Sequence, residues 1–225
     1  MNKEKNNEWL ATLLHFSDSV LPIGAYAHSF GLEGLCQLGA VQDAAGLKVF
    51  LERDVMASLL HVDLPIFALA HAAVLAGDFS ELTALDELSR ALRPTRQLRE
   101  AARTIGRQQW RLFMKTWELT TQMSFTATQS PVVLGTIFAL QGVPVMAGLN
   151  SVAYQTFSAL VQASLKLLPL GPSATQDILV NSMRKITLRL PGICELKADE
   201  LGTFNPLWDI GASRHERARA RLFLS

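Results

Sequence analysis

The chain has 225 residues and a formal net charge of +1, with 49% hydrophobic and 18% charged residues. The near-neutral balance gives no global field that favours nucleic acid. The length suits a domain with a substantial core, and the apolar surplus could cover a partner surface.

The N-terminal residues and the two cysteines favour an intracellular protein. Residues 1–7 are polar and lack the apolar stretch of a secretory signal, which predicts a short flexible tail and a cytoplasmic location. Cys36 and Cys194 lie far apart and form no zinc-binding spacing, so both are expected to be packed thiols.

Amphipathic periodicity predicts one helix after another along the chain. The first covers residues 8–16, with Trp9, Leu10, Leu13 and Leu14 on one face. A break is expected at Asp63-Leu-Pro65, because proline suits the first turn of a new helix. The other expected helices cover residues 28–35, 47–61, 65–76, 80–92, 95–121, 131–140, 151–168 and 173–190, with a loop at 191–205.

No strand-length alternation, internal repeat or low-complexity linker interrupts this pattern. The sequence therefore predicts an all-α, single-domain bundle of roughly eight to ten helices over residues 8–225. Residues 131–149 are the only membrane suspect, and Gln141, Gly142 and Pro144 interrupt them. Two short buried helices joined by a turn are expected there.

Residues 17–33 form an unusual connection between two helices. Pro22 fixes its own φ, Gly24 permits a sharp bend, and Gly31 allows close backbone approach. One interpretation is a presented site that uses polar side chains from Asp18 to Glu33. The other is a buried corner in which serine and aspartate cap helices and the glycines serve packing.

A basic stripe marks the helix expected at 95–121. Six cations recur every three or four residues and fall on one broad face: Arg96, Arg99, Arg103, Arg107, Arg111 and Lys115. The stripe could bind an acidic partner or phosphates. It could equally be a solvated face with Glu100 and Glu118 as local partners.

Motifs for catalysis and metal binding are not found. The histidines form no HxH or HExxH pattern, so no transition-metal site within one chain is indicated. Ser29, Asp18 and His28 are the residue types of a hydrolase triad, but the nucleophile elbow is missing and the context is helical. No phosphate-binding glycine loop is present.

The C-terminal segment, residues 212–225, combines arginines with an apolar end. Phe223 is expected to dock, either on its own fold or in the groove of a partner.

Five blocks of sequence, in order, resemble the UreF-type urease accessory proteins. The first is Asp18-Ser-Val-Leu-Pro-Ile-Gly-Ala-Tyr-Ala-His-Ser-Phe-Gly-Leu-Glu33. The others are Val62-Asp-Leu-Pro-Ile-Phe67, Thr95-Arg-Gln-Leu-Arg-Glu100, Lys166-Leu-Leu-Pro-Leu-Gly171, and Ser213-Arg-His-Glu through Arg221-Leu-Phe-Leu-Ser225. The chain departs from the family pattern at Ala25, where glycine is common, and at Pro172, where glutamine is usual.

The resemblance implies a helical, non-enzymatic scaffold that assists nickel insertion into urease. Such a protein acts as a homodimer and bridges a UreD/UreH-type accessory protein to a UreG-type GTPase. It couples the state of the GTPase to nickel delivery into apo-urease. It binds no cofactor directly, since partners carry nickel and GTP, and neither nucleic acid nor membrane is an expected partner. The alternative is a helical polyanion-binding module that uses the 96–115 stripe.

Residue roles follow from the same resemblance. Glu33 and Lys166 are expected to affect coupling, residues 213–225 to dock on UreD/UreH, and Tyr26 to belong to an interface. The full set of expected partner-binding or coupling residues is Tyr26, His28, Glu33, Arg96, Arg99, Arg103, Lys166, Arg214, His215, Glu216, Arg221, Leu222 and Phe223. The expected structural residues are Pro22, Gly24, Gly31 and Gly171.

Overall fold

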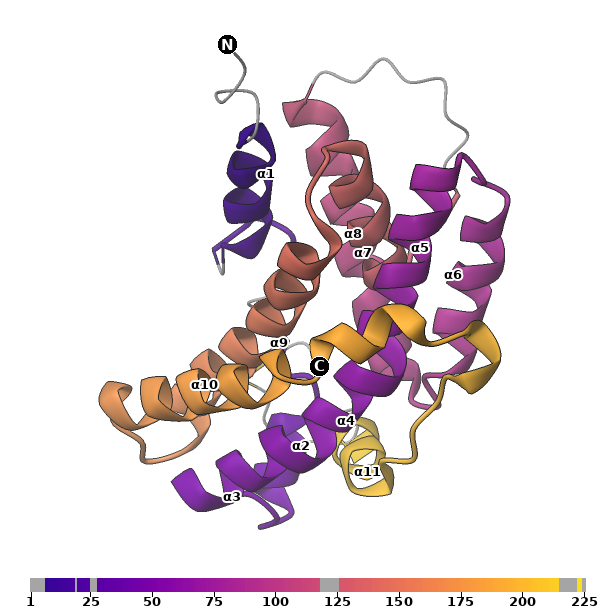
Figure 1. Cartoon of the computed structure of the whole chain (residues 1–225). Coiled ribbons are helices and arrows are strands. Elements are labelled where there is room, and N and C mark those ends of the chain that lie inside the picture. The colour runs from indigo at the N-terminus through magenta and orange to yellow at the C-terminus, as the bar shows by residue number, and fades with distance from the viewer. Residues whose placement is uncertain (1–6, 19, 25–27, 118–125, 215–221, 224–225) are drawn as a thin grey trace.

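The described part of the chain is a bundle of helices (Figure 1). A computed structural model describes residues 7–18, 20–24, 28–117, 126–214 and 222–223, and these contain no strand. The α-helices are α1 (Glu8–Ser17), α2 (Leu32–Gln37), α3 (Ala44–Val49), α4 (Met56–Ser58), α5 (Leu64–Ala76), α6 (Glu81–Ala91), α7 (Arg96–Thr116), α8 (Ser130–Leu140), α9 (Val145–Leu167), α10 (Pro172–Thr187) and α11 (Pro206–Arg214). The prediction of an all-α fold is confirmed.

Two apolar helices, α5 and α8, form the centre of the bundle, and α6, α7 and α9 pack around them (Figure 1). Both are apolar around nearly their whole circumference, as expected of helices that are buried on all sides. Their backbones approach closely at Gly135, where an added Cβ would lie 2.5 Å from the carbonyl oxygen of Phe67. The expected pair of short buried helices at 131–149 is correct only for the first.

The predicted helix break at Asp63-Leu-Pro65 is wrong. Residues Ala44–Ala76 form one continuous helix that contains two π-helical segments, η3 (Phe50–Val55) and η4 (Leu59–Asp63). Pro65 has no N–H to donate to the carbonyl of His61, four residues earlier. The backbone N–H of Gly202 donates to that carbonyl instead, at 3.0 Å, so the His61 carbonyl is paired where the helix passes Pro65.

The segment with the length and apolarity of a membrane span is not the one predicted from the sequence. Among the described residues, the helix Ala44–Ala76 is long and apolar enough to cross a bilayer, and 67% of its most apolar window is buried inside the fold. A mostly buried core helix can have the same length and apolar composition as a membrane-spanning helix.

Three further boundaries differ from the predictions. The helix expected at 151–168 begins at Val145, directly after Pro144, because Gly148 lets the helix pack on the rings of Phe67 and Phe138. The expected loop at 191–205 contains two 3₁₀ helices, η5 (Leu190–Glu195) and η6 (Ala198–Glu200), and helix α11 was not expected. Helix α7 ends at Thr116 rather than Thr121.

Candidate functional site

Three segments that are far apart in sequence meet at one place. The carboxylate Oε1 of Glu33 accepts a hydrogen bond from the backbone N–H of Leu222 at 2.9 Å. The ammonium group of Lys166, near the end of α9, lies 5.3 Å from the centre of the Phe223 ring. We call this site the tail junction and define it as Ser29, Glu33, Lys166, Leu222 and Phe223.

Glu33 is a buried acidic side chain, with 3% of its surface exposed. A buried carboxylate needs hydrogen-bond donors to offset the cost of leaving water, and the Leu222 amide is one of them. The Glu33 backbone N–H in turn donates to the Ser29 hydroxyl, at 3.5 Å. The terminal segment and the first turn of α2 are therefore joined through one side chain.

Leu222 and Phe223 differ in their exposure. Phe223 is buried in the main core, whereas Leu222 is 67% exposed. The Lys166 ammonium above the Phe223 ring is a cation–π contact, worth about 0.5–1 kcal/mol at an exposed site. Of the two docking places considered for Phe223, the structure shows the one on its own fold.

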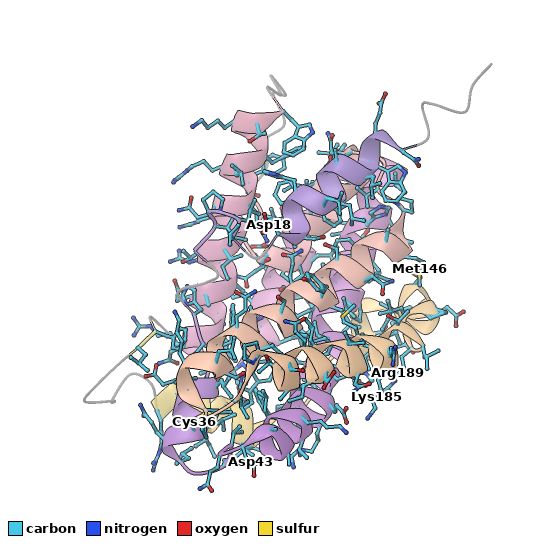
Figure 2. All side chains as sticks on the ribbon, turned by 90° about the vertical axis from the view of Figure 1, so that its left-hand side faces the viewer. Asp18, Cys36, Asp43, Met146, Lys185 and Arg189 are labelled. Carbon is cyan, nitrogen blue, oxygen red and sulfur yellow. The ribbon has the colours of Figure 1, made fainter. Side chains whose placement is uncertain are left out.

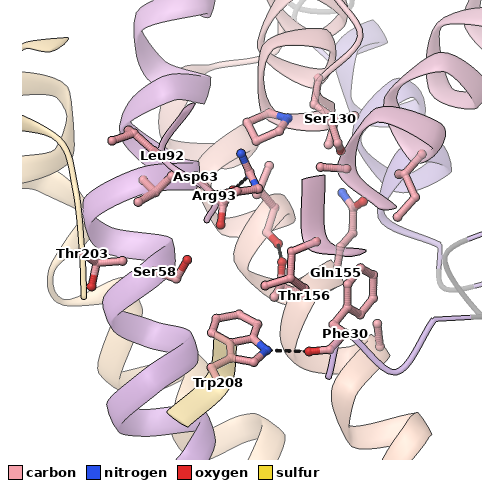
Figure 3. Close-up of a pocket in the computed structure, with 18 of the residues that line it drawn as sticks. Phe30, Ser58, Asp63, Leu92, Arg93, Ser130, Gln155, Thr156, Thr203 and Trp208 are labelled. Atoms are coloured by element: carbon pink, nitrogen blue, oxygen red, sulfur yellow. Dashed lines mark hydrogen bonds and ion pairs between the residues drawn. The ribbon is translucent and has the colours of Figure 1, made fainter. Parts of the chain in front are cut away.

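The backbone that leads into α2 is strained and tied down. Phe30 has φ +48° and Gly31 has φ +86°, two successive residues in the left-handed region. The indole N–H of Trp208 donates to the Phe30 carbonyl oxygen at 2.5 Å, drawn as a dashed line in Figure 3. A bulky residue is held in this conformation only where its surroundings enforce it, and Trp208 of α11 is part of that enforcement.

The backbones of helices α2 and α11 are in direct contact where the two helices cross. A Cβ on Gly34 would lie 2.0 Å from the Gly211 carbonyl oxygen, and one on Gly31 would lie 3.0 Å from Cβ of Ala212. Neither position can accept a larger residue without a backbone shift. The contact with Ala212 and the positive φ both favour glycine at position 31, in line with the structural role expected for it.

The structure explains the residue type at some of the other expected structural positions and not at others. Gly24 has φ +80°, which supports its role in a bend, and Pro22 between buried Leu21 and Ile23 is exposed. Gly171 caps α10 with φ −82°, and an added Cβ would meet open space. The structure therefore gives no steric reason for glycine at position 171.

Of the remaining expected partner-binding residues, those that the structure describes do not converge on the tail junction. Arg99 donates to the carbonyls of Arg93 and Pro94, at 2.7 and 2.6 Å, and Arg103 pairs with Glu100. Arg96 begins α7, and Arg214, the last residue of α11, is exposed. His28 is half-buried beside Phe30, with ring centres 5.8 Å apart. Four expected residues lie outside the described part of the chain: Tyr26, His215, Glu216 and Arg221.

A cavity of about 170 Å³ lies beside the strained segment, between the Ala44–Ala76 helix, α7, α9 and α11 (Figure 3). Phe30 and Trp208 border it at one end, and the ion pair of Asp63 with Arg93 lies in its wall. Burial raises the pKa of Asp63, and the Arg93 guanidinium opposes that shift. The cavity separates the basic helix α7 from α9 on this side of the bundle.

Sequence reasoning missed the α11 side of the site. Trp208, Gly211 and Ala212 fall at helical spacing after Pro206, which suits the first turn of a helix. That pattern could have predicted α11 and its packing face. The partner glycine, Gly34, directly follows the quoted signature and carries no polar group that would have attracted attention.

Metal donors do not gather in the described part of the chain: no three His, Cys, Asp or Glu side chains come together there.

Comparison with known proteins identifies relatives over nearly the whole chain. The UreF family model matches residues 41–183, more than half of the chain. The chain is 32% identical to the urease accessory protein UreF of Teredinibacter turnerae, over 97% of this chain and 100% of that protein. It is 31% identical to UreF of Arthrobacter sp. (strain FB24), over 95% of this chain and 96% of that protein.

A third relative is a longer protein. The bifunctional urease accessory protein UreEF of Bordetella bronchiseptica is 30% identical over 96% of this chain, which spans 52% of that protein's length.

The charge of Glu33 should be measurable through its neighbour Cys36. Burial and, secondly, the Glu33 carboxylate raise the pKa of the Cys36 thiol to about 11. Glu33→Gln removes the charge that opposes the thiolate, so the pKa falls and the reactive fraction at pH 8 rises. In a Cys194→Ser background, we expect iodoacetamide to alkylate Cys36 several-fold faster in the Glu33→Gln protein.

Glu100→Gln, on helix α7, is the matched control and should leave the alkylation rate unchanged. Equal rates in the Glu33→Gln protein and its parent would show that Glu33 does not act on the thiol.

Proposed function

Because this chain belongs to the UreF family of urease accessory proteins, we propose that it is a scaffold for nickel insertion into urease. It binds a UreD/UreH-type accessory protein and a UreG-type GTPase, and it couples the state of the GTPase to nickel delivery. In this proposal the chain catalyses no reaction itself, its partners carry GTP and nickel, and the complex acts in the cytoplasm.

The observation that carries this proposal is the tail junction. A buried carboxylate and an exposed ammonium, from two different helices, hold Leu222 and Phe223. Leu222 and Lys166 are exposed there, so a partner can contact the terminal segment and the Lys166 ammonium at one place. A surface assembled from α2, α9 and the C-terminal residues changes whenever one of these parts moves.

The energies suit a coupling role. A hydrogen bond to a charged group contributes about 1.5–3 kcal/mol, and an exposed cation–π contact contributes about 0.5–1 kcal/mol. Coupling between two binding sites typically amounts to about 1–3 kcal/mol. A partner that favours or displaces these two contacts would therefore shift the affinity for a second partner by a useful factor.

The bifunctional UreEF relative supports a place in an accessory complex. A protein named for two accessory activities carries a segment related to nearly all of this chain. When two accessory segments are joined in one chain, the effective concentration of each segment near the other is raised. Such a linkage favours two segments that act in the same complex.

The proposed homodimer has support on one face of the bundle. Leu14 of α1 is 62% exposed, and Tyr154 of α9 is 40% exposed. The two helices pack together and lie on the side turned to the viewer in Figure 2. An interface between two copies of the chain on this side would bury both apolar side chains.

The tail junction can be tested by removing its anchor. Phe223→Ala and Glu33→Ala each detach the terminal segment, so we expect about tenfold weaker binding of the UreD/UreH-type partner and lower urease activation. Deleting residues 222–225 should have the same effect. Titration calorimetry with the purified partner, and urease activity in cells that express the accessory proteins, measure the two outcomes.

Leu188→Ala is the control, because Leu188, directly after α10, is 83% exposed and takes no part in the junction. Thermal melting of each variant excludes general unfolding. Unchanged binding of the deletion variant would refute docking at the terminal segment.

The dimer is tested by placing charge on the apolar face. Leu14→Asp with Tyr154→Asp should convert a dimer to a monomer, because the carboxylates would be desolvated in the interface. Sedimentation velocity reports the change, with Leu188→Asp as control. A monomeric parent protein would refute the proposed dimer, and a double variant that remains dimeric would place the interface elsewhere.

A further inference from the structure

A row of cations on α7 takes no part in the tail junction. Arg107, Arg111 and Lys115 are all exposed, and we call them the α7 ridge. Their spacing of four residues puts them on one face on successive turns. With a rise of about 1.5 Å per residue, neighbours are about 6 Å apart and the row is about 12 Å long.

The ridge is not neutralised by its own helix. Glu100 is the only acidic residue of α7, and it pairs with Arg103. Arg111 donates to the neutral side-chain amide oxygen of Gln108, at 3.3 Å. Within the described residues, no carboxylate pairs with any of the three ridge cations.

The Asp86 carboxylate, which lies near this part of α7, already accepts hydrogen bonds from the start of α8. Helix α7 meets the start of α8 at Gly106, where an added Cβ would lie 2.1 Å from the Thr128 carbonyl oxygen. Asp86 caps that start, accepting from the backbone N–H groups of Thr128 and Gln129, both at 2.7 Å. Its charge therefore offsets the positive end of α8 and leaves the ridge uncompensated.

Helix stability explains only part of the ridge. Cations in the last turn of a helix interact favourably with its dipole, which accounts for Lys115. The effect falls off within one turn, so it does not account for Arg107, which lies more than two turns before the end of α7. At 0.1 M salt the screening length is about 10 Å, so the three charges act on a bound partner together.

We propose that the α7 ridge binds a carboxylate-rich face of a partner protein, at a surface separate from the tail junction. The partner is sought among the proteins of the accessory complex, and in that respect the inference rests on the proposed function. A row of about 12 Å matches acidic side chains on two to three turns of a facing helix.

The ridge is less suited to nucleic acid. Single-stranded binding combines a basic groove with exposed aromatic rings, and the aromatic residues of α7, Trp110 and Phe113, are half-buried and buried. The net charge of +1 provides no wider field that would hold phosphates along the rest of the surface.

A charge-reversed triple variant tests the ridge. Arg107→Glu, Arg111→Glu and Lys115→Glu are combined, and the matched control combines Lys48→Glu, Arg184→Glu and Arg189→Glu. Both sets are exposed and change the net charge equally. Helix α7 stands on the left of Figure 2, whereas Arg189 lies at the right, so the control probes the opposite side.

The first measurement uses a 20-residue poly-glutamate peptide and does not depend on the proposed function. We expect the parent and control proteins to bind the peptide at 50 mM salt and the ridge variant to bind at least tenfold more weakly. Equal binding by the ridge and control variants would overturn the proposal. So would a ridge-dependent affinity for a single-stranded oligonucleotide that exceeds the affinity for the peptide.

The second measurement uses the purified UreG-type and UreD/UreH-type proteins. We expect the ridge variant to bind one of them about tenfold more weakly, with a smaller salt dependence, while Glu33→Ala retains the ridge contribution. Equal affinities of the ridge variant and parent for both proteins would overturn the ridge alone. A parent that binds neither protein would instead refute the proposed function, and the peptide result would then decide the ridge.

Discussion

The buried carboxylate of Glu33 is the constraint on which the site depends. A carboxylate with 3% exposure is stable only where donors reach it. The Leu222 amide reaches it because Phe223 is anchored in the core and because α2 is pressed onto α11 through Gly34 and Gly211. Packing at glycine, one hydrogen bond and one buried aromatic ring thus fix Leu222 and Phe223 to the fold beside α2, in the first third of the chain.

The segment that precedes Glu33 is both a structural corner and part of a site. Phe30 and Gly31 adopt left-handed backbone conformations, and the Trp208 indole holds the Phe30 carbonyl. This rigid corner sets where α2 begins and therefore where the Glu33 carboxylate lies. The two interpretations of residues 17–33 that the sequence left open are compatible, because the corner is what positions the charged group.

Much of the fold was predictable from local pattern, whereas the site was not. Amphipathic spacing located most helices, but no local rule could show that Gly202 supplies the donor which lets the helix continue past Pro65. Helix α11 was missed because its packing face consists of glycine and alanine beside one tryptophan. Glu33 and Lys166 were named through resemblance; their contact with Leu222 and Phe223 joins positions more than 50 residues apart in sequence, which periodicity cannot reveal.

A scaffold that couples two partners needs an element whose contacts differ between states. In the proposed function, the terminal segment held at Glu33 is that element. The most direct test is hydrogen exchange at the amide of Leu222 in the free protein. The account predicts slow exchange in the parent and an increase of about tenfold or more in the Glu33→Ala protein, with the core amides of α5 unchanged. Exchange at the rate of an unstructured peptide in the parent would contradict it.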